Sequence, residues 1–262
     1  MSTDKIIKRF EGKVAVVTGG ASGIGDAIVR GLLSEGASVA VLDINASLLA
    51  DRQREFGAPF YGAPGDVTDE EIVACFISNC AERFGGLDMA FNVAGAGKGG
   101  PVVDHSVQDW DFTVDLCLKA VLLSLKHEAR QMLSRGGGSI VNVSSVCAHF
   151  PVYGAASYCS AKSGVEMLTK VAALELAGKS IRVNAILPGY TYTTGMRMAV
   201  DRPEYDKAVV ERIPLLRAAS PAEIAAPALF LASDDARYIA GASLVVDGGW
   251  ELLGCPVLSS PQ

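Results

Sequence analysis

The feature that most constrains the fold of this chain is a regular alternation of short apolar runs with longer amphipathic stretches. Apolar runs of strand length, without polar alternation, occur at 14–17, 38–42, 59–62, 87–91, 139–143, 181–186 and 243–246. Helix-length stretches separate them, at 22–35, 46–56, 69–84, 109–133, 157–177 and 222–231. Such runs are typical of strands covered on both faces, and the repeated order implies right-handed parallel crossovers. The sequence therefore predicts an α/β fold, a doubly wound parallel sheet of seven strands with helices on both faces.

No linker, composition shift or internal repeat divides the 262 residues, which predicts a single domain over 1–262. A domain of this mass buries about three quarters of its extended surface, so it needs no disulfide or metal to stabilise it. Only the segment 188–220 breaks the alternation. Because it follows the carboxyl end of a strand, where open α/β sheets bind ligands, we expect a substrate lid at about 190–217. The alternative is a surface loop with a short helix. The tail at about 251–262 either reaches a neighbouring subunit or frays.

Charge and cysteine usage exclude several classes of protein. The net charge is −6 and no basic run occurs, so we expect no nucleic-acid partner and no binding to anionic membranes. No apolar stretch reaches the roughly 18 residues of a membrane span, and no signal-peptide core is visible. The 6 cysteines and 3 histidines are scattered, which fits reduced thiols and no metal site. These features predict a soluble cytoplasmic protein.

A glycine-rich turn directly follows the first predicted strand and opens the first predicted helix. It reads Thr-Gly-Gly-Ala-Ser-Gly-Ile-Gly over 18–25. Glycine lets the backbone approach a pyrophosphate, whose negative charge is favoured by the free N–H groups and dipole of the helix. No Gly-Lys-Ser/Thr follows, which disfavours a nucleoside-triphosphate loop. Although many glycine-rich turns have no function, this context predicts a Rossmann dinucleotide site formed by Gly19, Ser22, Gly23, Ile24 and Gly25.

Asp43 ends the second predicted strand, 18 residues after Gly25. A carboxylate there can accept a hydrogen bond from an adenine-ribose 2′-hydroxyl and would repel a 2′-phosphate. The turn contains no Lys or Arg, and none follows Asp43 until Arg52. This favours NAD over NADP, the alternative being that Asp43 only caps the next helix. Further residues at this sheet edge are expected to contact the cofactor: Ile44, Asp66, Val67, Asn92, Ala94 and Gly95.

Tyr158 and Lys162 lie four positions apart on a predicted helix, which puts the phenol and the ammonium on one face. An ordinary Tyr has a pKa of about 10, too high for a base at neutral pH. We expect the ammonium and an oxidised nicotinamide to lower that pKa towards about 7. Ser144 and Ser145 end the fifth predicted strand nearby, where a hydroxyl can bind a substrate oxygen as it gains negative charge. Taken singly, such a Tyr-Lys pair is usually a surface pattern and such a serine a cap.

Together these features resemble the short-chain dehydrogenase/reductase family over nearly the whole chain. The resemblance is carried by Thr18-Gly-x-x-x-Gly23-Ile24-Gly25, Asp66, Asn92-x-Ala94-Gly95, Ser145, Tyr158-x-x-x-Lys162, Pro188-Gly189, Thr193 and Val246-Asp247-Gly248-Gly249. The resemblance implies that Tyr158 is the acid/base, that Lys162 holds the nicotinamide ribose and that Ser145, thirteen residues before Tyr158, binds the carbonyl or carbinol. It also implies that Pro188, Gly189 and Thr193 contact the cofactor, with Thr193 holding the carboxamide, and that the assembly is a homotetramer.

One position departs from the family pattern. The family's fourth catalytic residue is an Asn about seven positions after a Trp, and counting from Trp110 places Cys117 there. Cysteine cannot supply the two donors and the strong acceptor of an amide. The family suggests that the backbone carbonyl at this position holds the relay water. We therefore expect Cys117 to preserve activity through its main chain.

Residues between Ser145 and Tyr158, and residues of the lid, are candidates for the substrate pocket. They are Cys147, His149, Phe150, Tyr153, Tyr190, Tyr192, Met196 and Met198. Packing against neighbouring helices is the alternative for most of them. No cation other than Lys162 lies near Ser145 or Tyr158, which favours a neutral secondary alcohol or ketone as the substrate, although Arg197 in the lid keeps an anionic one open. The competing functions are a 3-oxoacyl-thioester (acyl carrier protein) reductase and an NAD-binding regulator that has lost its chemistry.

Overall fold

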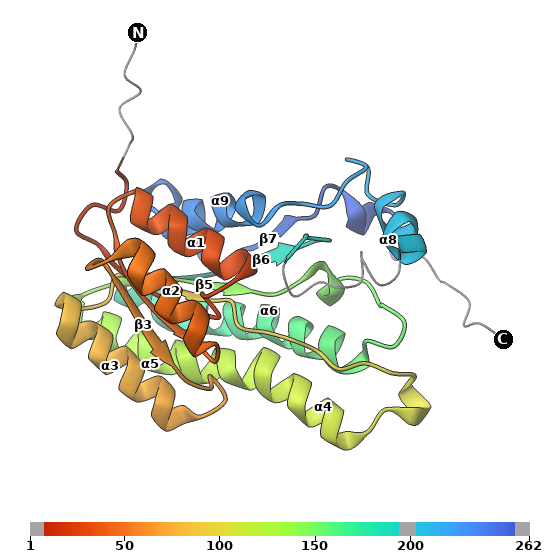
Figure 1. The fold of residues 1–262 in the computed structure, drawn as a ribbon, viewed down its shortest axis with the longest axis horizontal. Helices are drawn as coiled ribbons and strands as arrows, with labels where there is room; N and C mark the ends of the chain where they lie inside the picture. Colours follow the sequence, from red (N-terminus) through yellow and green to blue (C-terminus); the bar gives the residue numbers. More distant parts are fainter. Residues whose placement is uncertain (1–7, 194–202, 255–262) are drawn as a thin grey trace, which may run out of the picture.

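The computed structural model describes residues 8–193 and 203–254. Its centre is a parallel seven-stranded sheet in the order β3-β2-β1-β4-β5-β6-β7, which confirms the predicted fold class (Figure 1). The strands are β1 Val14–Thr18, β2 Ser38–Asp43, β3 Phe60–Pro64, β4 Met89–Asn92, β5 Gly138–Val143, β6 Ile181–Pro188 and β7 Ser243–Val246. Each of the predicted apolar runs is therefore a strand.

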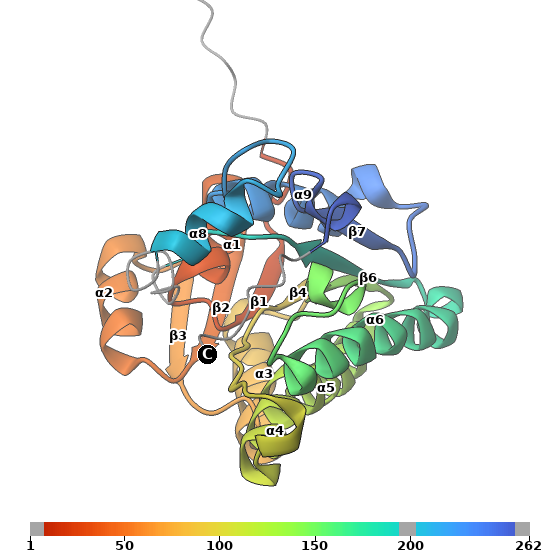
Figure 2. The ribbon, with the colours of Figure 1, turned by 90° about the vertical axis from the view of Figure 1, so that its right-hand side faces the viewer.

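Helices cover the sheet on both sides (Figures 1 and 2). On one side lie α1 Gly23–Ser34, α2 Ala46–Phe56 and α9 Pro221–Ala232. On the other side lie α3 Glu70–Phe84, α5 Ala120–Arg135 and α6 Ala156–Leu176. Strand β1 shows why its sequence is apolar throughout: Ala15 and Val17 belong to the first core, whereas Val14 and Val16 belong to the second. Two cores of this kind require apolar residues at every position of a central strand.

The order of strands reverses next to β1, and this reversal positions the site. The chain runs outward from β1 to β2 and β3, then returns to place β4 on the other side of β1. Thr18 at the end of β1 pairs in register with Asn92 at the end of β4. In doubly wound sheets, ligands bind outside the carboxyl ends of the strands at such a reversal.

The predicted helix at 109–133 is divided in the structure. It consists of α4 Val107–Val114, a π-helical turn Asp115–Lys119 and α5. The α and π segments follow one another without a gap, so the apolar periodicity of the sequence does not show the change of hydrogen bonding. Among the described residues, no helix combines the length and the apolar character that crossing a membrane requires.

The second half of the predicted lid is packed onto the end of β6. It contains α8 Pro203–Val210, and Val209, Ile213 and Ala218 join Leu187 and Trp250 in a third core. The residues 194–202 and the distal tail 255–262 lie outside the described residues.

Candidate active site

The glycine-rich turn between β1 and α1 is packed so closely that there is no room for a side chain at Gly19 or Gly25. Gly19 and Gly23 have φ values of 68° and 56°, in the left-handed region. A Cβ on Gly19 would lie 2.7 Å from the Cα of Ala94, and one on Gly25 would lie 2.1 Å from the carbonyl oxygen of Gly19. Ser22 stands at the N-cap of α1, yet its side chain makes no capping bond. The first N–H groups of α1 thus lack a side-chain cap, as a phosphate-binding helix requires.

The carboxylate of Asp43 joins the end of β2 to this turn. Its Oδ2 accepts a hydrogen bond from the Ala21 N–H at 3.1 Å, and its Oδ1 accepts one from the Asn45 N–H at 2.9 Å. The side chain that caps α2 belongs to Asn45. A carboxylate has about four acceptor positions, so Asp43 keeps capacity for a ligand hydroxyl. Of the two predicted isoleucines, Ile24 packs against the first core and Ile44 is 79% exposed beside Asp43.

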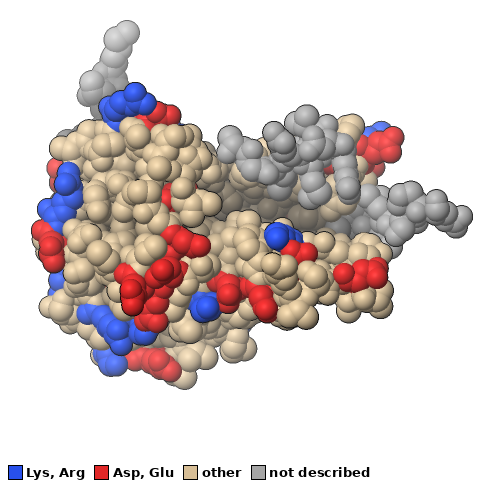
Figure 3. All heavy atoms as spheres, turned by 60° about the horizontal axis from the view of Figure 1, so that its bottom comes forward, with Lys and Arg blue, Asp and Glu red and all other residues tan. Residues whose placement is uncertain are grey.

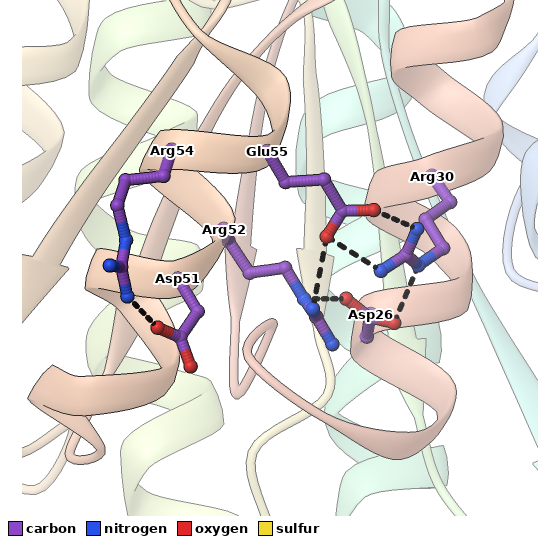
Figure 4. A network of polar contacts seen from close by, with 6 residues as sticks. All are labelled: Asp26, Arg30, Asp51, Arg52, Arg54 and Glu55. Carbon is purple, nitrogen blue, oxygen red and sulfur yellow. Dashed lines mark hydrogen bonds and ion pairs between the residues drawn. The ribbon is translucent and has the colours of Figure 1, made fainter.

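Arg30 on α1 and Arg52 on α2 are both bound by carboxylates (Figure 4). Arg52 donates to Asp26 at 2.5 Å and to Glu55 at 3.0 Å. Arg30 donates to the same two carboxylates, at 2.8 Å and 2.6 Å. Each of these guanidinium groups therefore bridges two carboxylates, and neither offers an unpaired charge to a 2′-phosphate beside Asp43.

The side chains predicted at the ends of β3 and β4 have different surroundings. Asp66 is exposed and its Oδ1 accepts from the N–H and the hydroxyl of Thr68, both at 2.8 Å, whereas Val67 is buried. Asn92 is only 2% exposed, and its amide nitrogen donates to Glu128 at 3.0 Å and to Asn142 at 2.9 Å. The Asn92 side chain thus binds the core, and only its backbone remains for the predicted contact with a cofactor.

The segment after β6 passes beside the glycine-rich turn. Pro188 ends the strand, and Gly189 fits so closely that a Cβ there would lie 2.6 Å from the Cα of Asp247. A Cβ on Gly23 would lie 3.3 Å from the Cβ of Thr193. Thr193 therefore lies beside the glycine-rich turn, whereas Gly189 packs against the residue that follows β7.

Ser145, Tyr158 and Lys162 come together where β5 ends and α6 begins. The Nζ of Lys162 lies 5.6 Å from the centre of the Tyr158 ring and donates to the carbonyl of Val143 at 2.8 Å. The Ser145 side chain lies near enough to the Tyr158 phenol to lower its pKa. The neighbouring Ser144 instead donates to the Lys162 carbonyl at 2.8 Å, which fixes α6 against the strand. The geometry thus separates the two serines, leaving Ser145 as the one beside the phenol.

Without a nicotinamide beside it, the phenol of Tyr158 lies in surroundings that raise its pKa. Burial raises the pKa of Tyr158 above its ordinary value of 10, the nearby Cys147 and Cys117 thiols raise it further, and the Ser145 hydrogen bond lowers it. Burial also lowers the pKa of Lys162. The prediction relied on two positive charges next to the phenol, and the ammonium of Lys162 alone does not offset the loss of hydration.

Cys117 lies in the π-helical turn and borders the same space as Lys162. It is fully buried, and its Sγ donates to the carbonyl of Ala96 at 3.2 Å. A Cβ on Gly95 would lie 3.5 Å from this sulfur and 3.4 Å from the Nζ of Lys162. Short π-helical turns change the i→i−4 pattern of backbone bonds and are frequent at functional sites.

We expect Cys117→Asn to change kcat by less than about threefold, because we expect this position to act through its main chain, which the substitution leaves in place. Steady-state kinetics of the variant beside Cys117→Ser, which keeps the size of the side chain, would measure this. A many-fold gain for Asn but not for Ser would show that the side-chain amide is needed.

His149, which was predicted to contact the substrate, lies between two carboxylates in the structure. Its Nδ1 lies 2.8 Å from Glu251 and its Nε2 lies 3.0 Å from Glu166 on α6. Both ring nitrogens are therefore taken. The imidazole joins the turn after β5, α6 and the segment after β7, and this explains why its pKa is raised, first by Glu251 and then by Glu166 against the effect of burial.

The His149 contacts predict a pH-dependent stability difference. The folded-state pKa lies above the ordinary 6.5, so their contribution is fully present below pH 6.5 and is lost as the pH rises through the folded-state pKa. We expect His149→Gln to lower Tm at pH 6 and to match the wild type at pH 9. Thermal melts across that range, with Glu251→Gln as a second variant, measure the difference in Tm between the wild type and each variant. A Tm difference that stays constant with pH would contradict the role given to the His149 contacts.

The other predicted pocket residues divide into exposed and packed groups. Tyr153 is 67% exposed and Cys147 is partly exposed close to Tyr158. Phe150 instead packs edge-on against Trp250, with ring centres 5.3 Å apart. Phe150 therefore packs against a neighbouring aromatic side chain, which was the alternative to a place in the substrate pocket.

The two lid tyrosines anchor α8. The hydroxyls of Tyr190 and Tyr192 donate to the carboxylate of Asp206, at 2.7 Å and 3.1 Å. Tyr190 is buried against Trp250, whereas Tyr192 is 47% exposed. Met196, Arg197 and Met198 lie outside the described residues.

Sequence reasoning missed two groups at this site. Cys159, which follows Tyr158, has a lowered pKa for which Cys147 is the largest cause, and nothing in a spacing of twelve residues signals that the two thiols influence each other. Glu128 is fully buried, and its carboxyl group accepts a hydrogen bond from the Asn92 amide. A glutamate on the apolar face of a predicted helix was the one available signal for it. No group of three or more His, Cys, Asp or Glu in the described parts of the chain is placed to hold a metal ion.

Comparison with known proteins agrees with this geometry. A family model described as enoyl-(acyl carrier protein) reductase matches residues 19–251. The chain is 37% identical to 2,5-dichloro-2,5-cyclohexadiene-1,4-diol dehydrogenase of Sphingobium indicum, over 93% of this chain and 98% of that protein. It is 41% identical to D-threitol dehydrogenase of Mycolicibacterium smegmatis, over 93% of this chain and 95% of that protein. The structure of a short-chain type dehydrogenase/reductase from Mycobacterium ulcerans superposes on this chain with a TM-score of 0.91 at 33% sequence identity. The match covers 94% of this chain and 92% of that chain. With its sheet, its glycine-rich turn and its Ser-Tyr-Lys cluster, this chain belongs to the short-chain dehydrogenase/reductase family of oxidoreductases.

Proposed function

We propose that this protein is an NAD-dependent dehydrogenase that interconverts a neutral secondary alcohol and its ketone. The observation that carries the proposal is the meeting of Ser145, Tyr158 and Lys162 at the sheet edge that also holds the glycine-rich turn. A hydroxyl, a phenol and an ammonium placed together provide what a carbonyl–carbinol reaction needs: an oxygen-binding group, a proton donor or acceptor, and a cation.

The residues of the crevice fit a nicotinamide dinucleotide. The turn from Gly19 to Gly25 leaves backbone N–H groups of α1 for the pyrophosphate. Asp43 would accept from the adenine-ribose hydroxyls beside the exposed Ile44, and Thr193 would bind the carboxamide. The pairing of the nearby arginines with carboxylates, together with Asp43, supports NAD over NADP, because a 2′-phosphate there would meet a negative charge without a free cation.

The proposed chemistry divides between the cofactor and three side chains. The nicotinamide, when bound, supplies hydride transfer. Ser145 binds the substrate oxygen, and Tyr158 moves the proton at that oxygen. A protonated phenol can donate to a ketone oxygen, and a phenolate can accept the proton of an alcohol. Burial favours the protonated form of Tyr158, and a positively charged nicotinamide would favour the phenolate. Lys162, held by Val143, places a positive charge close to the phenol and can bind the nicotinamide ribose.

The substrate proposal rests on the neutral surroundings of the site and on the two relatives. The sulfur of Cys147 and the exposed ring of Tyr153 lie close to Ser145 in the chain, and Tyr192 stands at the base of the lid. One relative is named for a cyclohexadienediol and the other for D-threitol, so hydroxylated carbon skeletons are the natural first substrates. The alternative, an acyl-thioester reductase, is favoured by the description of the matching family model and by a 36% identity to a 3-oxoacyl-[acyl-carrier-protein] reductase of Thermotoga maritima. Asp43 argues against the NADPH that such reductions usually employ.

We also propose a cytoplasmic homotetramer that binds neither nucleic acid nor membranes. Support for an assembly comes from exposed apolar side chains on α5 and α6: Leu122, Met167, Val171 and Leu174. Acidic side chains gather near the middle of the face in Figure 3, with Lys and Arg mainly at its edge, which is unlike a basic nucleic-acid surface.

The test is NADH formation from NAD⁺ across cyclic and acyclic secondary alcohols and diols, with NADP⁺ and a 3-oxoacyl thioester with NADPH as competing arms. We expect turnover with NAD⁺ and a kcat/KM for NAD⁺ at least about 100-fold that for NADP⁺, corresponding to roughly 3 kcal/mol of discrimination. Turnover restricted to the thioester arm would reject the proposed substrate class, and a preference for NADP⁺ would reject the role of Asp43.

A further inference from the structure

A glycine-rich loop that follows β4 lies directly against the ring of Tyr158. It reads Ala-Gly-Lys-Gly-Gly over 96–100. A Cβ on Gly97 would lie 3.1 Å from the Cδ2 of Tyr158 and 3.5 Å from its Cγ, so bare backbone packs on the phenol side chain. The residues 96–99 are exposed. Because glycine backbone is conformationally free, such a loop keeps its place beside Tyr158 only if contacts on its inner side hold it.

Two buried hydroxyl groups hold the middle of this loop, at the two backbone groups of Lys98. The Oγ1 of Thr113 on α4 accepts from the Lys98 N–H at 3.0 Å and donates to the Asp109 carbonyl at 2.9 Å. The hydroxyl of Ser157, the second residue of α6, donates to the Lys98 carbonyl at 3.1 Å. Thr113 and Ser157 are both 0% exposed. Two helices therefore fix the backbone of the residue next to Gly97.

Further contacts lie at the two ends of the loop. At its end, the Gly100 N–H donates to the Gly154 carbonyl at 2.8 Å, and a Cβ on Gly99 would lie 2.5 Å from the same oxygen. At its start, the thiol of Cys117 donates to the Ala96 carbonyl at 3.2 Å. A thiol is a weak donor, so the hydroxyl and N–H contacts supply most of the restraint.

We propose that Thr113 and Ser157 are positioning residues: they hold the loop 96–100 against the ring of Tyr158 and thereby fix the phenol relative to the substrate oxygen. The proposal rests on the proposed function, in which Tyr158 moves a proton at that oxygen. Ser157 also precedes Tyr158 in α6, so one hydroxyl joins the loop to the helical turn that carries the phenol. Proton transfer requires the two heavy atoms within about 3.2 Å of each other, so a loosened ring lowers the rate of chemistry.

Thr113→Val keeps the branched shape of the side chain and leaves the Lys98 N–H without its acceptor. A displacement of about 1 Å at a catalytic group costs roughly 100-fold in rate, and we expect the loss of one of the two hydroxyls to lower kcat by about 5- to 20-fold. The KM for NAD⁺ should stay within about twofold, because the glycine-rich turn and Asp43 lie on other elements. Thr113→Ser keeps the hydroxyl and should retain at least half of the wild-type kcat.

Thr169→Val is the matched control. Thr169 on α6 is also 0% exposed, and its hydroxyl accepts from the Asn142 amide at 2.9 Å and donates to the Val165 carbonyl at 2.8 Å. The same chemical group is thus removed from an equally buried place. We expect a lower Tm and a kcat within about twofold of the wild type. Ser157→Ala is a smaller change than Thr113→Val and should lower kcat in the same way, which keeps the test decisive if Thr113→Val does not fold.

Two measurements separate positioning of the phenol from a general loss of stability. In a Tyr158→Phe background, Thr113→Val should cause no further loss of the residual turnover, because residues that act through one group are not additive. Hydrogen exchange of the peptide that covers 96–100 should be at least tenfold faster in Thr113→Val than in the wild type, and unchanged in Thr169→Val.

Unchanged kcat in both Thr113→Val and Ser157→Ala would reject the proposal. So would a loss of kcat that persists in the Tyr158→Phe background, or one that Thr169→Val shows equally. If the wild type turns over no alcohol or ketone, the proposed function fails and takes the effect on kcat with it. The exchange of the 96–100 peptide still decides, in that case, whether the two hydroxyls hold the loop.

Discussion

Tyr158→Phe is expected to lower kcat by about 10³-fold, within the range that a positioned general acid–base contributes. The variant removes only the phenolic oxygen, and the ring that Gly97 approaches keeps its place: a Cβ on Gly97 would lie 3.1 Å from the Cδ2 of Tyr158. Cofactor binding should be unchanged, because the glycine-rich turn and Asp43 lie on β1, α1 and β2. Steady-state kinetics in both directions and titration with NAD⁺ separate the two effects.

Tyr238→Phe supplies the matched control, since that ring is fully exposed and the same oxygen is removed. It should keep the wild-type kcat. A Tyr158→Phe protein that retains more than a tenth of the wild-type turnover would show that another group carries the proton. Loss of NAD⁺ binding in the same variant would instead point to a disturbed crevice.

The fold could be predicted because its central strands carry the signal of both cores. Four successive apolar residues from Val14 to Val17 contact helices on opposite faces, so no polar position interrupts the run. The turn was equally visible, because the positive φ of Gly19 and its contact with Ala94 admit no other residue. Local sequence therefore determined the elements and the cofactor end of the site.

The parts that could not be predicted depend on contacts between distant residues. His149 is bound by Glu251, 102 positions away, and Asn92 by Glu128, 36 positions away. Neither pairing leaves a periodic signal. The burial that raises the pKa of Tyr158 is a related case, since the sequence shows which charges can lie nearby but not how much hydration a side chain loses on folding.

Glu128 is a second titratable group for which burial decides the protonation state. It is fully buried on α5, its Oε2 accepts from the Asn92 amide at 3.0 Å, and its Oε1 has no partner among the described atoms. Burial raises its pKa from 4.5 to about 8, against the effect of the Asn92 hydrogen bond. At neutral pH the folded protein therefore holds a proton on Glu128 that the unfolded chain releases.

This difference predicts a loss of stability as the pH rises. Between the unfolded pKa of 4.5 and the folded pKa of about 8 the folded state binds one more proton, so the free energy of unfolding falls throughout that window and then levels off. Glu128→Gln has nearly the shape of the protonated acid and does not titrate. We expect it to match the wild type near pH 5 and to exceed its stability by a few kcal/mol at pH 9, with Tm higher by roughly 5–10 °C.

Urea unfolding of the wild type and Glu128→Gln at several pH values measures the prediction directly, because groups common to both proteins cancel in the difference. Glu128→Ala serves as the control. It removes the acceptor of the Asn92 amide and leaves a cavity, so it should be less stable than Glu128→Gln at every pH. Parallel pH dependences for the wild type and Glu128→Gln would mean that Glu128 is ionised in the folded protein. The partner of that buried charge would then have to lie elsewhere than in the Asn92 amide, because a single neutral hydrogen bond does not compensate for the desolvation of a carboxylate.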